Sequence, residues 1–240
     1  MIILAFDSTA KSASVAVCDG DRVLGKFDID NGLTHSELLL PMAESLLEKL
    51  KLSISDIGLL TCTAGPGSFT GVRIGTALVK GLALGRNIPT VAVSTLEALA
   101  ESLSGIPCIA VPVMDARRSQ VYTAIFKSSE SGITRLSEDM AIGIEELANK
   151  LSQYDGENIY LVGDGYSVAK AGLSSFGIKL SETPKLLINQ SAVSCAAVAK
   201  RKYELGEYAS DLELIPTYLR VPQAERERLE RENNANKENI

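Results

Sequence analysis

Short hydrophobic runs alternate with longer segments of helical periodicity along most of the chain. Residues 2–6 are all apolar and predict a buried strand, and residues 13–18 and 23–27 predict a hairpin closed at Asp19-Gly20. The spacing of apolar positions then predicts that helices and strands alternate. The expected elements are a helix from Thr34 to Leu50, a strand at 58–63, a helix at 68–85, a strand at 90–93 and a helix at 94–103. Pro41 lies inside the first of these helices and predicts a kink or a later start.

A similar order of elements begins again near residue 106. The expected elements are strands at 108–114, 120–126 and 134–136, a helix at 144–151, a strand at 159–162 and a helix at 191–205. We therefore expect an α/β protein with two similar units, residues 1–105 and 106–222. Residues 223–240 carry mixed charges and almost no apolar side chains, so we expect a disordered tail.

Composition narrows the classes of function. The 240 residues carry a net charge of -6, with 5% aromatic residues and no Trp, which argues against unaided binding of nucleic acid. No apolar run is long enough to span a bilayer, and the 4 Cys residues show no CxxC pairing. We expect a cytoplasmic protein with reduced, buried thiols and no membrane contact.

The stretch "AGPGSFTGVRIG", residues 64–75, combines a glycine-rich loop with the start of a helix. Ser68 is placed to cap this helix, and a helix start of this kind attracts anions. It is not a P-loop, because no Gly-Lys-Ser/Thr closes it. Gly71 and Gly75 lie four residues apart, as do Gly81 and Gly85, with Ala77 four before Gly81, and each pair forms a flat strip on one helix face. Composition alone leaves open whether such a strip meets the protein's own sheet or another protein.

The helix that reaches Leu50 favours the second alternative. Its apolar residues occupy more than one helical face, although one face is enough to cover a sheet; they are Leu38, Leu39, Leu40, Met42, Ala43, Leu46, Leu47 and Leu50. A helix that is apolar on two sides is either buried within its own chain or meets a partner.

Few residues are suited to catalysis. The tripeptide Asp7-Ser8-Thr9 at the end of the first strand, together with Ser68, could contact a nucleotide phosphate or another anion, although such a tripeptide is equally typical of an ordinary turn. Arg117 and Arg118 stand where a second phosphate loop would need glycine. His35 is the only histidine, so a site with two histidines is excluded and we expect no metal.

These stretches together resemble a known family. "ILAFDSTAKSASVAV", "THSELLLPM", "AGPGSFTGVRIG", "KGLALG", "VSTLEALA", "MDARRSQVY" and "PTYLR" are similar, in order and spacing, to the TsaB (YeaZ) family. Members of this family are dimerization subunits of the bacterial tRNA threonylcarbamoyladenosine complex. The resemblance covers the chain up to the charged tail. It implies two ribonuclease-H-like units of the actin, Hsp70 and sugar kinase type.

The resemblance also implies a task. Such a subunit has no catalytic residues of its own and binds a TsaD-like catalytic paralogue, which transfers a threonylcarbamoyl group to the anticodon-adjacent adenosine of tRNAs reading codons that begin with A. A TsaE-like ATPase and a TsaC-type adenylate-forming enzyme are the further partners, and tRNA is met mainly through the complex. The resemblance implies that the subunit has no cofactor of its own. It leaves open whether ATP or ADP binds at the partner interface.

The family pairs through the first two helices of the N-terminal unit. The implied interface residues are Leu39, Met42, Leu46, Gly71, Val72, Gly75 and Leu78, and a homodimer through the same helices is an alternative pairing. Two other functions are alternatives. A free-standing ATPase or small-molecule kinase of the same fold would depend on Asp7, and a metal-dependent glycoprotease would need ligands that a chain with one histidine scarcely provides.

Overall fold

The computed structural model describes residues 1–117 and 119–220. Arg118 and the predicted disordered tail at 223–240 lie outside the described residues. The first part of the chain forms β1 (Ile2–Asp7), β2 (Ala13–Asp19), β3 (Arg22–Ile29), α1 (His35–Leu50), η1 (Ile54–Asp56), β4 (Leu59–Thr63), α2 (Phe69–Ala83), β5 (Thr90–Val93) and α3 (Thr95–Glu101). The remainder forms β6 (Cys108–Asp115), β7 (Gln120–Thr123), β8 (Phe126–Ser129), β9 (Gly132–Arg135), β10 (Met140–Gly143), α4 (Ile144–Leu151), η2 (Ser152–Tyr154), β11 (Ile159–Val162), α5 (Tyr166–Ser175), η3 (Lys185–Leu187) and α6 (Ala192–Glu204).

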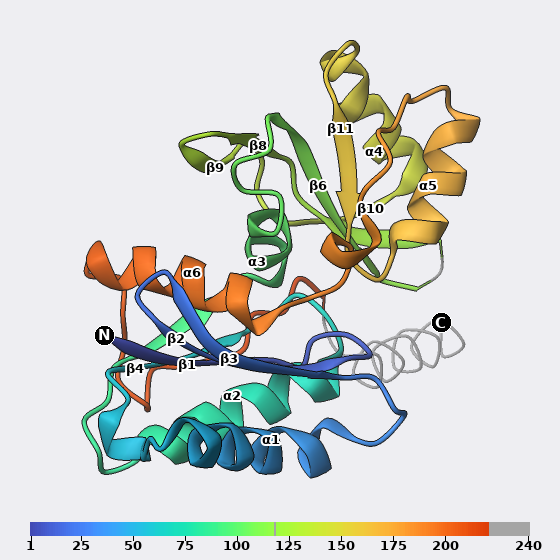
Figure 1. Cartoon of the computed structure of the whole chain (residues 1–240). Helices are drawn as coiled ribbons and strands as arrows, with labels where there is room; N and C mark the ends of the chain where they lie inside the picture. The colour runs from blue at the N-terminus through green and yellow to red at the C-terminus, as the bar shows by residue number, and fades with distance from the viewer. Residues whose placement is uncertain (118, 221–240) are drawn as a thin grey trace, which may run out of the picture.

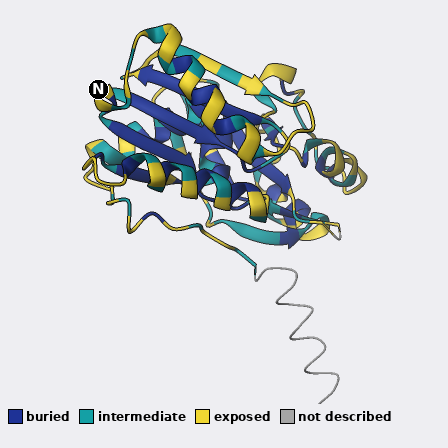
Figure 2. Ribbon diagram, turned by 90° about the horizontal axis from the view of Figure 1, so that it is seen from below, coloured by how far each residue is buried: buried dark blue, intermediate teal, exposed yellow. Residues whose placement is uncertain are grey.

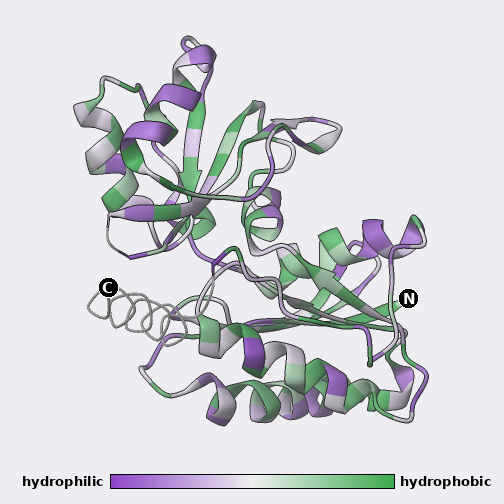
Figure 3. Ribbon diagram, turned by 180° about the vertical axis from the view of Figure 1, so that it is seen from behind, coloured by the Kyte–Doolittle hydropathy of each residue, from purple (hydrophilic) through white to green (hydrophobic). Residues whose placement is uncertain are grey.

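The first sheet has the strand order β3-β2-β1-β4-β5. The first three strands pair antiparallel, and β4 and β5 extend the sheet in parallel to β1. All residues of β4 and all but the first of β1 are buried, because helices cover both faces of the sheet: α1 and α2 on one face and α6 on the other (Figure 1). The central strands are accordingly hydrophobic along most of their length (Figure 3).

The second sheet repeats the first four strands of this order. Strands β7 and β8 pair with the same edge of β6 in one antiparallel register, in which Met114 faces Tyr122 and Ala110 faces Phe126. They are therefore two halves of one interrupted strand, with β10 and β9 beyond them. Strand β11 pairs in parallel with the other edge of β6. The prediction of two similar units is confirmed, whereas β8, β10 and α5 were not predicted as separate elements.

Helix α1 begins at His35 and contains Pro41, so of the two outcomes predicted for Pro41, a kink or a later start, the later start is wrong. The capping residues explain this. The Glu37 carboxylate accepts hydrogen bonds from the backbone N–H of Thr34 at 3.0 Å and from its hydroxyl at 2.7 Å. These bonds satisfy a free amide at the start of the helix and lower the pKa of Glu37.

The predicted end of the second unit, residue 222, needs correction, because α6 packs on the first sheet. Cys195 and Ala199 of α6 share a core with Ile3 and Val93 of that sheet. The backbone N–H of Ala192 also donates to the Ser14 hydroxyl at 2.8 Å. Sequence order assigned this helix to the second unit, but its apolar side matches the uncovered face of the first sheet. The second unit thus ends before α6.

Helix α3 lies between the two sheets and contacts both units. Leu96, Leu99 and Leu103 pack with strands of the second sheet, whereas Ala98 joins the core around α6. The paired helices α3 and α6 therefore connect the units (Figure 1). Across the described ranges, no helix combines the length and hydrophobicity that a membrane span requires.

Candidate functional site

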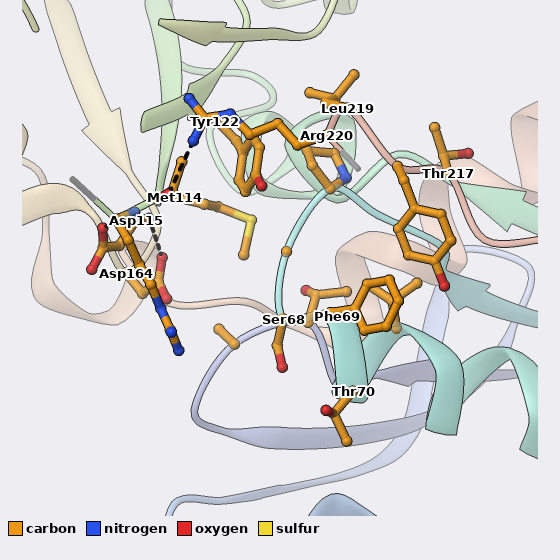
Figure 4. A pocket seen from close by; sticks show the side chains of 18 of the residues that line it. Ser68, Phe69, Thr70, Met114, Asp115, Tyr122, Asp164, Thr217, Leu219 and Arg220 are labelled. Carbon is orange, nitrogen blue, oxygen red and sulfur yellow. Dashed lines mark hydrogen bonds between the residues drawn. The ribbon is translucent and has the colours of Figure 1, made fainter. Parts of the chain in front are cut away.

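A cavity of about 430 Å³ opens between the two units. Figure 4 shows that its walls come from both units and from the last described residues of the chain. The segments that line it are the β1–β2 loop at Thr9, the start of α2 at Ser68, the end of β6 at Met114 and Asp115, the turn at Asp164, and residues 217–220. This is where the sequence predicted contacts for an anion.

Two of the four predicted anion contacts are turned away from this cavity. Asp7 and Ser8 are each 1% exposed, and the Ser8 hydroxyl donates to the backbone oxygen of Gly71 at 2.8 Å. Their prediction as ligand contacts is therefore corrected: they hold the β1–β2 loop against α2. Thr9 and Ser68 do line the cavity, and the Ser68 hydroxyl accepts a hydrogen bond from the Gly71 amide at 3.2 Å.

Asp7 is a buried carboxyl at the end of β1. One oxygen, Oδ1, accepts hydrogen bonds from the amide of Thr9 at 3.0 Å and from its hydroxyl at 2.7 Å. The other oxygen, Oδ2, has no hydrogen-bond partner among the described residues. Burial raises the pKa of Asp7 above its ordinary value of 3.8, and the bonds from Thr9 act in the opposite direction.

The loop after β6 carries charged side chains where a phosphate loop would carry glycine. The amide of Arg117 donates to the Asp115 carboxylate at 2.7 Å, and the amide of Asp115 donates to Asp164 at 3.2 Å. Partial desolvation at the cavity edge raises the pKa of Asp164, and the nearby charge of Asp115 raises it further. The guanidinium of Arg220 lies over the Tyr122 ring at 5.6 Å in the same region (Figure 4). Acidic and basic side chains thus lie in the same wall, where the two carboxylates accept hydrogen bonds from backbone amides.

The predicted partner residues lie mostly inside the chain. Leu39, Met42, Leu46, Gly71, Val72 and Gly75 are all buried, and Leu78 is half-buried against the same core. A Cβ atom at Gly71 would stand 1.8 Å from the backbone oxygen of Ser8, and one at Gly75 would stand 2.6 Å from the Ser8 hydroxyl. This glycine strip therefore allows the β1–β2 loop to approach α2, and the six buried residues cannot form a surface for a partner.

The other pair of small residues on α2 is open. Ala77 and Gly81 are exposed, and apart from the helix's own backbone no atom of the described residues lies within 4 Å of where a Cβ would stand at Gly81. Helices α1 and α2 lie in one layer, and Figure 2, which views the molecule from this side, shows exposed positions along them. We call a set of residues on these two helices the outer face: Leu40, Glu44, Ala77 and Gly81 are exposed, and Leu47 and Ile74 are half-buried and also pack on the core.

The sequence held a signal for this face. The spacing of Ala77 and Gly81 was visible, but nothing in it distinguished the pair from Gly71 and Gly75. Leu40 is 40% exposed, as an apolar residue outside the core-facing stripe of α1 would be.

The residues around His35 do not fit a metal. Its Nε2 atom is buried without a hydrogen-bond partner in the described part of the chain. Among residues 1–117 and 119–220, no group of three or more His, Cys, Asp or Glu side chains is arranged as a ligand set. A metal site needs a cluster of ligands, which the described residues around His35 do not form.

Comparison with known proteins gives one consistent family. The family model described as TsaD, tRNA N6-adenosine threonylcarbamoyltransferase, matches residues 32–228. The Escherichia coli (strain K12) tRNA threonylcarbamoyladenosine biosynthesis protein TsaB is 32% identical over 227 residues, covering 92% of this chain and 95% of that protein. The TsaB protein of Bacillus subtilis (strain 168) is 30% identical over 226 residues, covering 94% and 96% respectively.

A solved structure agrees. YeaZ from Pseudomonas aeruginosa superposes with a TM-score of 0.75 at 24% identity, covering 91% of this chain and 99% of that chain. This likeness shows that the two chains share a fold, and the predicted fold class is confirmed. On the family-model match and on relatives that are similar along nearly their whole length, the chain belongs to the TsaB family of tRNA threonylcarbamoyladenosine biosynthesis proteins.

Proposed function

We propose that this chain is a non-catalytic subunit that binds a TsaD-like threonylcarbamoyltransferase and makes it competent. The reaction that the partner catalyses is the transfer of a threonylcarbamoyl group to the anticodon-adjacent adenosine of tRNAs reading codons that begin with A. The observation that carries the proposal is the outer face, where Ala77 and Gly81 of α2 and Leu40 of α1 are exposed to solvent. Small residues at this spacing let another helix approach closely.

The chemistry of the chain supports a subunit without catalysis of its own. Asp7, the carboxyl on which an ATPase of this fold would depend, is buried and bonded to Thr9. The β6–β7 loop offers Arg117 in place of the glycine that a phosphate needs. In the described part of the chain, His35 belongs to no group of three or more metal-binding side chains. We therefore place the catalytic centre in the partner.

The partner surface is made by helices α1 and α2, as the family resemblance implied, but with different residues. The proposed contacts are those of the outer face, with Leu78 at its flank. A helix pair of a paralogue with the same fold suits this surface, and a second copy of this chain could pair through it when the paralogue is absent. A TsaE-like ATPase, a TsaC-type enzyme, tRNA, and ATP or ADP at the interface belong to the same proposed cytoplasmic assembly.

The deciding experiment is reconstitution of the modification. Labelled threonine would be supplied to unmodified tRNA with the cognate catalytic subunit, ATPase and adenylate-forming enzyme, with and without this chain. Incorporation only in its presence supports the proposal. Equal incorporation in its absence overturns the proposal, and ATP turnover by the isolated chain would then be the next measurement.

Two alanine variants test the surface itself. Ala77 on the outer face and Ala171 on α5 are both exposed alanines inside helices. Leucine costs little helix stability at either position, so Ala77→Leu and Ala171→Leu should both fold. We expect Ala77→Leu to weaken binding of the catalytic subunit at least about tenfold, a loss of about 1.4 kcal/mol, and Ala171→Leu to leave it unchanged. Equal affinities for the two variants would mean that the partner binds elsewhere.

A further inference from the structure

After α6 the chain stays on the first unit and runs beside α2. The backbone of Thr90 pairs with that of Ala209, and Lys80 of α2 donates from Nζ to the backbone oxygen of Leu212 at 3.2 Å. The last described residues, 217–220, then reach the cavity between the units. We call these four residues the clasp.

One end of the clasp is fixed to the first unit. The amide of Thr217 donates to the backbone oxygen of Ala64 at 2.7 Å. The Tyr218 ring lies 4.9 Å from that of Phe69, and its hydroxyl accepts a hydrogen bond from Arg73 Nε at 2.9 Å. The Arg73 guanidinium also stacks 3.8 Å from the centre of the Phe69 ring. The clasp is therefore held to the first turns of α2.

The other end is fixed to the second unit. The Arg220 guanidinium donates to the backbone oxygen of Ala116 at 3.2 Å and to Oε1 of Gln120, and it lies over the Tyr122 ring. All three partners belong to β7 or to the loop that joins it to β6. Hydrogen bonds from a charged donor are stronger than neutral ones, and stacking on an aromatic ring adds to them.

We propose that the clasp holds the two units closed across the cavity and couples this closure to α2. Two units that share only a limited interface are expected to move relative to one another. Apart from the clasp, helices α3 and α6 connect the two units of this chain. Arg220 and Tyr218 are two residues apart, so release of the β6–β7 loop also loosens the support of Phe69 and Arg73. An open cavity would then weaken partner binding at the outer face, a last step that rests on the proposed function.

Hydrogen exchange of the full chain tests the clasp without any partner. In Arg220→Ala we expect amides of residues 113–123 and 69–76 to exchange about fivefold faster, because hydrogen bonds of this kind contribute about 1 kcal/mol each. Gln120→Ala should give the same direction of change, and the double variant should change less than the sum of the two, since both remove one contact.

Arg135→Ala is the matched control. Its guanidinium also bonds a backbone oxygen, that of Ser137 at 3.2 Å, and stacks on an aromatic ring, that of Phe126 at 4.6 Å. It pairs with Asp139 at 2.6 Å as well, and none of these partners belongs to α2 or to the clasp. We expect this variant to leave exchange in residues 69–76 unchanged. If residues 113–123 and 69–76 of Arg220→Ala exchanged at the wild-type rate, the proposed role of the clasp would be overturned.

Binding of the catalytic subunit, measured by calorimetry, tests the coupling. Arg220→Ala should bind about fivefold more weakly, in proportion to the loss of protection. Faster exchange with unchanged affinity would overturn the coupling and leave the proposed function intact. Absence of binding by the wild-type chain would instead overturn the proposed function, while the exchange data would still decide the clasp.

Discussion

Helix α2 carries two pairs of small residues at the same spacing, and they do opposite things. Gly71 and Gly75 lie against the β1–β2 loop, where added Cβ atoms would stand 1.8 Å and 2.6 Å from atoms of Ser8. Ala77 and Gly81 face solvent. Spacing of four residues shows which positions share a helix face, but the side of the helix that meets the sheet depends on the neighbouring loops. The inner pair serves the fold, and the outer pair is free for a partner.

The sharpest test of this difference is Gly71→Ala. The added methyl group meets the backbone oxygen of Ser8, which cannot rotate away. We expect a loss of about 3 kcal/mol in the free energy of unfolding, because overpacking a tight contact outweighs the better helix propensity of alanine. Urea unfolding would measure it. A variant as stable as the wild type would mean that the loop does not pack on α2 in this way.

Gly75→Ala should cost less, because its methyl group meets the Ser8 hydroxyl. The hydroxyl can rotate, but it then loses its 2.8 Å bond to the buried oxygen of Gly71. We expect a net loss of about 1 kcal/mol after the gain in helix propensity. In a Ser8→Ala background the same substitution should no longer destabilise, whereas Gly71→Ala should stay harmful. Equal effects of Gly75→Ala in both backgrounds would contradict the assigned contact.

The sequence predicted most of the fold because the strongest signals were local. Buried strands such as β1 and β4 appear as apolar runs, and α1 begins at a Thr34–Glu37 pair that satisfies its own free amides. The elements it missed have weak local patterns. Strand β10 is short, and the interruption of β7 and β8 becomes visible only through their common register with β6.

The sequence could not predict packing contacts that depend on segments far apart in the chain. Helix α6 packs on the first sheet, and this placement depends on an uncovered face formed by strands that all precede residue 94. The same holds for the predicted site residues. Leu39, Met42 and Gly75 were assigned to a partner surface, and the β1–β2 loop and the first sheet bury them instead. The residues of the clasp were recognised only as part of the motif "PTYLR".

A smaller effect that varies with pH is expected from Asp7→Asn, next to the loop that covers the inner pair. Burial raises the pKa of Asp7 in the folded chain, so the folded state holds its proton more tightly than the unfolded state. The contribution of Asp7 to stability therefore falls as pH rises from its ordinary pKa of 3.8 towards the raised value. Asparagine keeps the acceptor for Thr9 and has no charge to bury.

The measurement is urea unfolding of both proteins between about pH 4 and pH 8. We expect the stability of Asp7→Asn relative to the wild type to increase with pH and then to level off. Parallel curves over this range would mean that the carboxyl is ionised at little cost, and that solvent reaches the Oδ2 atom.

The smallest expected effect, and the one of opposite sign, belongs to the outer pair. Gly81→Ala adds a methyl group in open space, so only the helix propensity changes, and we expect a gain of up to about 1 kcal/mol in unfolding free energy. Thermal unfolding of Gly81→Ala beside Gly71→Ala would measure both under one set of conditions. A gain at residue 81 with a loss at residue 71 would show that one helix uses glycine in two ways. A loss at both positions would mean that the outer pair also packs within the chain, and the proposed partner surface would then have to lie on α1 alone.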